Sequence, residues 1–500
     1  MTAAILAAAA SAAAEPSAAA PSASITPAVA EAINARFERF RQAAHAPGLV
    51  WGIVQDGRLV RFGGLGVQDL ETGRPVTADS VFRIASMSKA FTALAILKLR
   101  EDGKLSLDDP LERFLPEART WRYPTSDSPR LRVSDLLGHT GGFGPDDPWS
   151  DRQQPMSERS FTQLLKGGFS FNHAPQTTYE YSSLGYALLG RVVTNISGAR
   201  YDRYIESQFL RPLGMGATGY EIADVPPERL AVGYRWEDDK FVQEPSMPNG
   251  AFGAMGGVHT SANDYARWVA FLLSAWPARD GPETGPVRRA TVRELALGAS
   301  FPRISQRPRP GEAGPCPFAT VYSAGFNVVR DCDLGLVLTH NGGYPGYGST
   351  VLLLPESGVG IFVFVNRTYA APTAAAFDAA QDLKAAGLLH AAPPTVSDAL
   401  ARAYERAHEM YSAGVLTPGR DALAMNVLMD RSAENWAREF GRLKAAVGGC
   451  AAREPIVATG RLAGHFTWTC ERGALRGTIE LSPTNPPLIQ TLRLEEVTKS

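Results

Sequence analysis

The chain has 500 residues, of which 50 are basic and 51 are acidic, and its formal net charge is −1. Such a balance excludes a strongly basic nucleic-acid-binding surface, and a hydrophobic content of 44% is typical of an ordinary water-soluble globular protein. Past the extreme N-terminus no apolar run reaches the roughly 20 residues that a membrane span needs, so we expect no integral membrane segment.

The N-terminal 27 residues are rich in alanine. An apolar stretch containing Ile5 and Leu6 is followed by small residues that resemble an export cleavage site. No basic residue precedes this stretch, since the first is Arg36. We expect residues 1–27 to be a signal peptide, which would make the protein periplasmic or secreted. A disordered leader and a mis-chosen start codon are the alternatives.

A helix over residues 28–44 and a hairpin of residues 48–55 and 58–63 precede the most informative motif, Ser86-x-x-Lys89. Ser86 and Lys89 stand three residues apart at the head of a long apolar helix, so their side chains share one face. The helix dipole makes a proton on a lysine in this turn easier to lose. A lysine of this kind can activate a serine nucleophile, although Ser86 is also a suitable helix cap.

Residues 111–273 have the pattern of helices and long loops, and they include Tyr181 and Ser183 at the start of an apolar helix. Residues 276–318 are rich in Pro, Gly and Arg, which predicts a surface excursion around one short helix at 287–297. The four cysteines form two locally spaced pairs without metal-site spacing. We expect two disulfides in an oxidising compartment, or free thiols in a cytosolic protein. These pairs are Cys316 with Cys332 and Cys450 with Cys470.

Strand patterns return late in the chain, at 323–329, 335–338, 349–354 and 360–366, and a helix over 374–389 follows. The predicted sheet is therefore split between the two ends of a domain of residues 28–390, with a helical region inserted between them. A linker of residues 391–397 leads to a separate small α+β domain of residues 398–500. Its expected helices and strands lie at 398–412, 420–429, 433–447, 460–470, 474–481 and 488–495.

The order of S-x-x-K at residue 86, Y-S-x at residue 181 and H-x-G at residue 340 resembles the serine β-lactamase-related family. This family includes class C β-lactamases, D-alanyl-D-alanine carboxypeptidases, D-aminopeptidases and esterases. Three further segments, 136–142, 211–215 and 254–265, resemble family segments in the same order. The resemblance covers roughly residues 28 to 389. It implies a mixed α/β fold of the β-lactamase and transpeptidase type, in which helices flank an antiparallel sheet.

The resemblance also implies acyl transfer. Ser86 would attack a carbonyl carbon, and Lys89 and Tyr181 would share the roles of general base and acid, the nearby ammonium favouring a phenolate at Tyr181. The backbone N–H groups of Ser86 and Gly343 would hold the oxyanion. His340 would belong to the catalytic set, and no cofactor or metal is expected. The substrate-binding positions implied are Ser183, Asn341 and Gly342.

Two departures from the family pattern bear on the substrate. Ser183 stands where the family has an Asn, and a hydroxyl is shorter and makes fewer hydrogen bonds. His340 stands where β-lactamases have a Lys that would attract a substrate carboxylate. Both changes favour an esterase or a D-amino-acid peptidase over an efficient β-lactamase. On local grounds alone, Tyr181 is equally suited to a core and His340 to a solvated loop.

We therefore expect a serine hydrolase that cleaves an ester or amide of a small molecule or peptide through an acyl-enzyme. The alternatives are a D-alanyl carboxypeptidase, a D-aminopeptidase, a β-lactamase, or a catalytically weak penicillin-binding or sensing protein. Rival hydrolase motifs, G-x-S-x-G and H-E-x-x-H, are absent from the sequence. The residues of the C-terminal domain do not indicate a protein partner.

Overall fold

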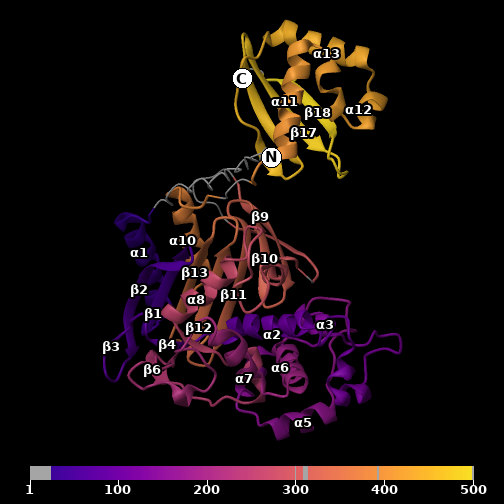
Figure 1. The fold of residues 1–500 in the computed structure, drawn as a ribbon. Coiled ribbons are helices and arrows are strands. Elements are labelled where there is room, and N and C mark those ends of the chain that lie inside the picture. The colour runs from indigo at the N-terminus through magenta and orange to yellow at the C-terminus, as the bar shows by residue number, and fades with distance from the viewer. Residues whose placement is uncertain (1–23, 299, 308–313, 391–393, 498–500) are drawn as a thin grey trace, which may run out of the picture. The chain divides into compact units, whose positions relative to one another are not determined.

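A computed structural model describes residues 24–298, 300–307, 314–390 and 394–497. The chain forms two compact units, Met1–His390 and Ala391–Ser500, and each is described by itself (Figure 1). Residues 1–23 of the predicted leader and residues 391–393 of the predicted linker lie outside the described residues. Among the helices described, none combines the length and the apolar character that crossing a membrane requires.

A nine-stranded antiparallel sheet forms the centre of the first unit. Its strand order is β3-β2-β1-β13-β12-β11-β10-β9-β8, so the N-terminal hairpin pairs with the last strand of the unit. This is the split sheet that the sequence predicts, and the expected fold class is confirmed. The strands are β1 (Gly48–Gln55), β2 (Arg58–Asp69), β3 (Arg74–Pro75), β8 (Arg303–Arg307), β9 (Cys316–Ser323), β10 (Phe326–Asp331), β11 (Gly335–Tyr344), β12 (Tyr347–Leu354) and β13 (Val359–Val365).

Helices cover both faces of this sheet. In β1, alternate side chains face opposite layers: Trp51 and Ile53 pack toward α1 and α10, whereas Val50 and Val54 join the core beneath α2, α6 and α8. The helices of this unit, including short 3-10 and π turns labelled η, are α1 (Pro27–Ala43), η1 (Ala85–Ser88), α2 (Lys89–Glu101), η2 (Leu111–Arg113), η3 (Pro116–Thr120), α3 (Val133–Leu137), α4 (Asp147–Arg152), α5 (Glu158–Gly167), α6 (Ser183–Ser197), α7 (Tyr201–Ile205), η4 (Glu206–Leu210), η5 (Ile222–Asp224), η6 (Ala251–Met255), α8 (Ala262–Leu273), α9 (Arg289–Arg293), η7 (Glu294–Ala296) and α10 (Thr373–Ala385).

Two short strand pairs complete the unit. β5 (Tyr234–Glu237) pairs with β6 (Lys240–Gln243), and β4 (Val81–Arg83) pairs with β7 (His259–Ser261). The second pair is important for the site because β4 runs into η1 and α2.

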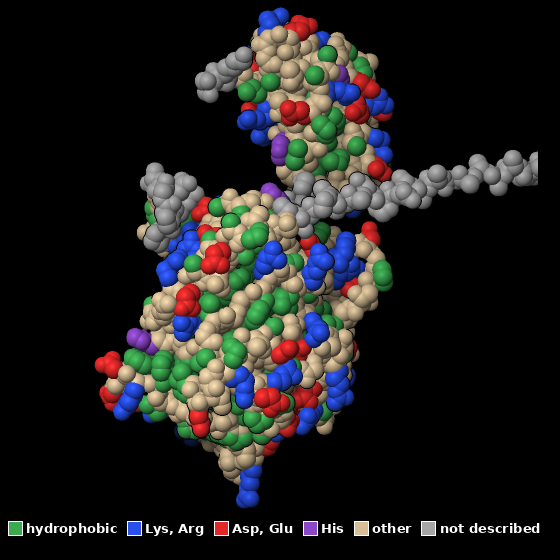
Figure 2. Space-filling model, turned by 90° about the vertical axis from the view of Figure 1, so that its left-hand side faces the viewer, with side chains coloured by type: hydrophobic (Ala, Val, Ile, Leu, Met, Phe, Trp, Pro, Cys, Tyr) green, Lys and Arg blue, Asp and Glu red, His purple; other side chains and the backbone are tan. Residues whose placement is uncertain are grey.

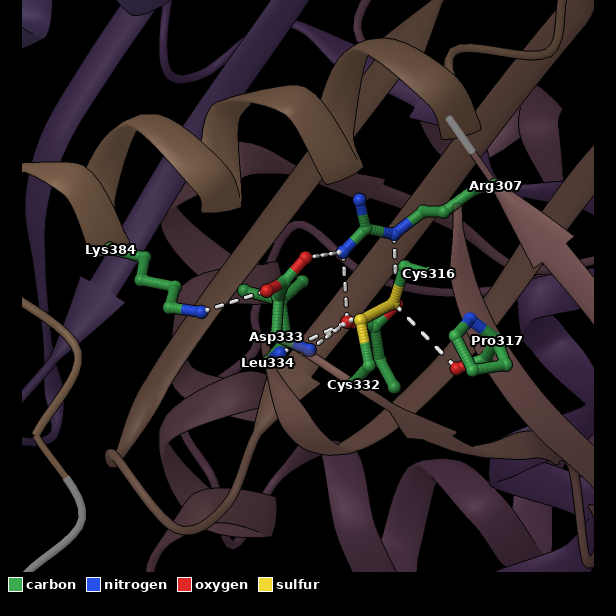
Figure 3. The surroundings of a disulfide bond; sticks show 8 residues. Arg307, Cys316, Pro317, Cys332, Asp333, Leu334 and Lys384 are labelled. Atoms are coloured by element: carbon green, nitrogen blue, oxygen red, sulfur yellow. Dashed lines mark hydrogen bonds and ion pairs between the residues drawn. A yellow bond between two sulfur atoms is a disulfide. The ribbon is translucent and has the colours of Figure 1, made fainter. Parts of the chain in front are cut away.

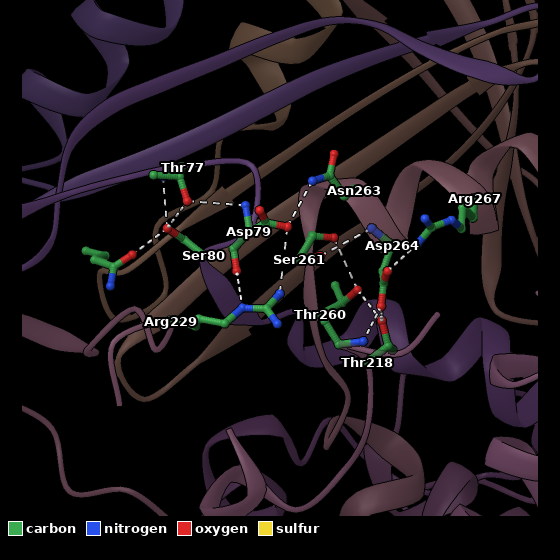
Figure 4. Close-up of polar contacts among 12 residues, drawn as sticks. Thr77, Asp79, Ser80, Thr218, Arg229, Thr260, Ser261, Asn263, Asp264 and Arg267 are labelled. Atoms are coloured by element: carbon green, nitrogen blue, oxygen red, sulfur yellow. Dashed lines mark hydrogen bonds and ion pairs between the residues drawn. The ribbon is translucent and has the colours of Figure 1, made fainter. Parts of the chain in front are cut away.

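A polar network holds β7 and the start of α8 in place (Figure 4). Ser261 caps α8 by accepting a hydrogen bond from the Asp264 N–H at 3.2 Å. The buried Asp264 carboxylate accepts from the Ala217 N–H at 2.6 Å, from the Thr218 hydroxyl at 3.0 Å and from Arg267 at 2.6 Å. The segment before β7 and the helix after it are therefore joined through one carboxylate.

A disulfide joins Cys316 to Cys332 at the far edge of the sheet (Figure 3). Beside it, Arg307 of β8 donates to Asp331 at 2.9 Å and to Asp333 at 2.8 Å. Lys384 of α10 also donates to Asp333, at 3.1 Å. These contacts link strand β8, the β10–β11 turn and α10.

The second unit is a small α+β fold. Its strands form one sheet whose inner face carries Trp468, Leu475 and Ile479, packed against the helices. A second disulfide joins Cys450 to Cys470. Its elements are α11 (Asp398–Ala413), η8 (Thr417–Ala422), α12 (Met425–Asp430), α13 (Ala433–Val447), β14 (Ala452–Arg453), β15 (Val457–Gly460), β16 (Ala463–Cys470), β17 (Gly473–Leu481) and β18 (Ile489–Glu496).

The structure differs from the sequence expectations in three places. Ser86 lies in the 3-10 turn η1, and α2 begins only at Lys89. Strand β11 continues through Tyr344, so His340 is a strand residue with a buried side chain and not a loop residue. The segment 276–318 contributes strand β8 and the start of β9, which its Pro and Gly content did not suggest.

Charged side chains of both signs are interspersed over the face of the first unit drawn in Figure 2, as the near-zero net charge predicts. Substrate selection is therefore expected to depend on local groups in the site and not on a long-range field.

We predict that Asp264→Asn lowers the free energy of unfolding of the first unit by about 1–3 kcal/mol, because an amide replaces a buried carboxylate that accepts three hydrogen bonds. Asp79→Asn is the matched control, since Asp79 belongs to the neighbouring part of the network but its side chain is 66% exposed. Its effect should stay within about 0.5 kcal/mol. Urea denaturation measures both variants, and equal losses would contradict this role of Asp264.

Candidate active site

The candidate nucleophile lies in a tight turn between β4 and α2. Ala85 has φ of 50°, a left-handed conformation that is strained for a residue with a side chain. Ser86 follows it and is 8% exposed. Ser349 of β12 donates to the Ile84 carbonyl at 2.8 Å, which holds this turn against the sheet.

Lys89 is fully buried, and three oxygen atoms surround its Nζ. They are Ser86 Oγ at 3.0 Å, Ser183 Oγ at 3.0 Å and the Met255 carbonyl oxygen at 2.9 Å. Burial lowers the pKa of Lys89 from its ordinary value of 10.5, and nearby aspartates oppose this effect without cancelling it. Burial is therefore a stronger cause of the lowered pKa than the helix dipole that the sequence suggested.

The Ser183 hydroxyl links Lys89 to the carboxylate of Asp147. Ser183 donates its hydroxyl proton to Asp147 Oδ1 at 2.7 Å, so an oxygen lone pair of Ser183 remains for Lys89. Ser183 replaces the Asn of the family pattern and was expected to make fewer hydrogen bonds. Its hydroxyl nevertheless contacts Lys89, so only part of the hydrogen bonding is lost.

The neighbouring Asp146 binds the N-terminal end of α6. It accepts from the N–H groups of Ser183 at 2.7 Å and Leu184 at 2.8 Å, which are the first free N–H groups of α6. Ser182, the residue at the cap position, makes no such side-chain bond. Asp146 therefore fixes the helix end that carries Ser183.

A third carboxylate, Asp151, lies one helical turn beyond Asp147 on α4. Its Oδ2 accepts from the Tyr369 hydroxyl at 2.8 Å. Burial, with a smaller contribution from Asp147, raises the pKa of Asp151 from 3.8 to about 7, although the Tyr369 bond and Lys89 act in the opposite direction. Tyr369 also packs against Gly343, where a Cβ would lie 2.7 Å from its ring.

Tyr181 lies over the lysine, whose Nζ is 5.0 Å from the centre of the ring. Burial raises the pKa of Tyr181 well above 10, with the charge of Asp147 as the next cause, and a hydrogen bond with Ser86 offsets part of the rise. The predicted phenolate is therefore not supported: burial outweighs the attraction of the ammonium, and Tyr181 keeps its proton at neutral pH.

His340 is buried on β11, 6.0 Å from the Tyr181 ring between ring centres. Its Nε2 bonds the Tyr322 hydroxyl at 3.0 Å, and its Nδ1 lies 2.6 Å from the Asn341 carbonyl oxygen. Burial, assisted by the charge of Lys89, lowers the pKa of His340 to about 3, so its imidazole is neutral at physiological pH. The side chain of Asn341, the next residue along β11, is exposed.

The glycine of the H-x-G motif allows the strand to approach the nucleophile. A Cβ on Gly342 would overlap the Ile84 carbonyl oxygen and lie 3.0 Å from the Ala85 Cβ. β11 can therefore lie directly against η1, which brings Gly343 to the same side of the molecule as Ser86.

The structure thus brings together Ser86, Lys89, Tyr181 and Ser183, with His340 beside Tyr181. The two predicted cysteine pairs form the disulfides described above. Sequence reasoning missed several members of the site, and apart from Met255, which lies in the family-like segment 254–265, no motif marks them. They are Asp146, Asp147, Asp151, Tyr322, Tyr369 and the carbonyl group of Met255. The three aspartates fall within six residues, and this spacing was the one signal that could have been noticed.

Comparison with known proteins gives a consistent result. The family model described as Beta-lactamase matches residues 33–386. Protein flp of Staphylococcus aureus strain COL is 27% identical over 338 residues, which cover 67% of this chain and 63% of that protein. The chain thus spans somewhat less than two thirds of this relative. The D-alanyl-D-alanine-carboxypeptidase/endopeptidase AmpH of Escherichia coli K12 is 28% identical over 302 residues, which cover 58% of this chain and 72% of AmpH.

One solved structure is similar over both units. The octameric penicillin-binding protein homologue from Pyrococcus abyssi aligns with a TM-score of 0.58 and 20% identity, and the alignment covers 93% of this chain and 99% of that one. At this identity the similarity shows the fold alone.

We predict that Asp151→Asn becomes more stable relative to the wild type as pH rises from 5 to 8. In the wild type, the folded-state pKa of about 7 lies above the ordinary value of 3.8, so ionisation of Asp151 costs stability across this range. The amide remains neutral and still accepts from Tyr369. Thermal melts at pH 5, 6, 7 and 8 measure the difference. Asp127→Asn, at an exposed carboxylate, is the control, and an equal pH trend in both variants would contradict the burial of Asp151 as its cause.

Proposed function

Because the chain belongs to the beta-lactamase family, we propose that it is a serine hydrolase that cleaves an ester or amide bond through an acyl-enzyme on Ser86. The observation that carries this proposal is the set of three oxygen atoms around Lys89 Nζ.

In the proposed reaction Lys89 begins as the neutral amine that its lowered pKa favours, with two N–H donors and one lone pair to distribute among the three oxygen atoms. The Met255 carbonyl accepts one N–H, and Ser183 Oγ, whose own proton goes to Asp147, accepts the other. The lone pair is then left for the Ser86 hydroxyl at 3.0 Å. A lysine held in this way, with a pKa lowered by burial, is suited to be a general base.

In the proposed reaction, the bond between Ser86 Oγ and the substrate carbonyl carbon forms as the hydroxyl proton moves to Lys89 Nζ. The backbone N–H groups of Ser86 and Gly343 would stabilise the oxyanion. Tyr181, protonated because burial raises its pKa, would pass a proton from Lys89 to the leaving group as the C–O or C–N bond breaks. A water molecule would then hydrolyse the acyl-enzyme with the same groups in reverse roles.

The charges of the site favour a substrate without a carboxylate next to the scissile bond. His340 is neutral at the position where a permanent cation would attract an anion, and the charges of Asp147 and Asp151 act on Lys89. We therefore favour an esterase or an amidase for uncharged acyl groups over a β-lactamase. Exposed Trp149 and Tyr369, on and beside α4, supply apolar surface for such a group.

A second candidate is a D-alanyl peptidase, because AmpH is a relative and carries this activity in its name. A third candidate is a catalytically weak penicillin-binding or sensing protein. This candidate applies if Ser86 is acylated but the acyl-enzyme is not hydrolysed. The two disulfides favour an oxidising compartment, periplasmic or extracellular, for either activity.

We predict that a fluorophosphonate adds one adduct, located on Ser86 by peptide mapping after intact-mass analysis. Lys89→Ala should slow adduct formation by about 100- to 10,000-fold, because the general base is lost. Near-wild-type labelling of a folded Lys89→Ala protein would contradict the proposed base.

The substrate class can be tested by comparing rates on a short-chain p-nitrophenyl ester, a chromogenic cephalosporin and a D-alanyl peptide. The charge argument predicts that the ester is cleaved fastest. Faster cleavage of the peptide would favour the second candidate, whereas a stable penicillin adduct without turnover of any substrate would indicate a sensing protein.

We predict that Asp147→Asn moves the acidic limb of the kcat/KM profile to lower pH. The charge of Asp147 raises the pKa of Lys89, so its removal allows the amine to lose its proton at lower pH. The amide oxygen can still accept from Ser183. Asp224→Asn, at an exposed carboxylate, should leave the limb unchanged. A shift of the Asp147→Asn limb to higher pH would exclude Lys89 as the titrating base.

A further inference from the structure

Arg83 is a buried cation whose charge the neighbouring protein does not balance. It lies in β4, three residues before Ser86, and is 1% exposed. Its Nη2 donates to the Met247 carbonyl, but Nη1 has no hydrogen-bond partner within the described residues. The guanidinium also lies over the Tyr344 ring, 5.4 Å from its centre. A buried guanidinium with one carbonyl acceptor and one aromatic face is costly unless a counter-charge is present.

Neighbouring titratable groups form no direct ion pair with Arg83 among the described residues, although Glu244 and Arg83 line the same cavity. His259 faces Arg83 across the β4–β7 pair, and burial together with the charge of Arg83 lowers its pKa to about 3, so it is neutral. Glu244 is nearby, but Arg152 lies 3.6 Å from its carboxylate and Thr368 donates to it at 3.2 Å. No ion pair joins Glu244 to Arg83 in the part of the chain that the structure describes.

A small cavity lies next to Arg83. Its volume is about 50 Å³, and Tyr344 lines it together with Arg83. The Tyr344 hydroxyl is buried and, like Arg83 Nη1, has no partner among the described residues. Arg83 Nη1 and the Tyr344 hydroxyl, two donors that have no hydrogen-bond partner among the described residues, therefore belong to residues that line one cavity. The other lining residues that bear on the argument are Gly233, Glu244, Ser246 and Met247.

We propose that this cavity binds a small monovalent anion of the halide class, such as chloride. A monatomic anion can accept from both Arg83 Nη1 and the Tyr344 hydroxyl and balances the buried charge. A cavity of about 50 Å³ has space for a small ion or a water molecule.

The position of the cavity connects it with the active site. Arg83 is continuous with the turn that carries Ser86, and Tyr344 directly follows Gly343 on β11. A bound anion would hold the ends of these two segments at a fixed separation. We therefore expect halide to increase thermal stability and, if the proposed function is correct, to increase the rate of acylation. This second effect rests on the proposed function, whereas the binding does not.

The binding is tested on the full-length protein with bromide and chloride. Crystals grown in sodium bromide should show an anomalous peak in contact with Arg83 Nη1 and the Tyr344 hydroxyl. In solution, sodium chloride should raise Tm saturably above the value in sodium gluconate of equal ionic strength, because gluconate is too large for the cavity.

Tyr344→Phe should reduce the chloride effect on Tm, since it removes one of the two donors. Tyr220→Phe is the matched control, because the hydroxyl of Tyr220 is also buried and unpartnered but does not line this cavity, and it should keep the full effect. If Tyr344→Phe fails to fold, the bromide peak in the wild type decides the question. Absence of that peak together with equal Tm values in the two salts would show that the cavity holds only water, and would overturn the proposal. Fluorophosphonate labelling of Ser86 is independent of this result, so failure of the anion site and failure of the proposed function can be distinguished.

Discussion

The site depends on keeping an amine in the interior of the protein. Lys89 is fully buried, and burial favours the neutral form of its side chain. Three oxygen atoms at 2.9–3.0 Å surround its Nζ, and in the proposed neutral form two of them accept its N–H groups while its lone pair faces Ser86. The left-handed turn at Ala85 and the close approach of β11 at Gly342 lie directly beside the serine whose hydroxyl takes the third of these positions.

The aspartates near Lys89 raise its pKa through their charges and so oppose the effect of burial, but they do not form a simple ion pair with it. Asp147 is separated from the lysine by the Ser183 hydroxyl, Asp146 is occupied by the N–H groups of α6, and Asp151 is held by Tyr369. Each carboxylate stabilises the ammonium somewhat, yet none bonds it directly. This arrangement lowers the pKa of Lys89 less than burial alone would, and keeps the charged form accessible during the reaction.

Much of this arrangement could be predicted from the sequence where the signal was local. The spacing of Ser86 and Lys89, the order of the three motifs and the split sheet all follow from short-range patterns. The aspartates and Tyr369 could not be predicted, because residues 146–151 and 369 come together only when the inserted helical region folds against the segment between β13 and α10. The protonation state of Tyr181 was misjudged for a related reason. A sequence indicates which charges are near one another, but the extent of burial, which dominates here, depends on the complete fold.

The proposed role of Lys89 is tested most directly by measuring its pKa. In protein labelled with ¹⁵N-lysine, the Nζ signal that disappears in Lys89→Met can be assigned to Lys89 and followed by NMR across pH. The account predicts a pKa clearly below the ordinary value of 10.5, with a further decrease in Asp147→Asn. A pKa at or above the ordinary value would mean that Lys89 remains an ammonium, and it would contradict the assignment of this residue as the base.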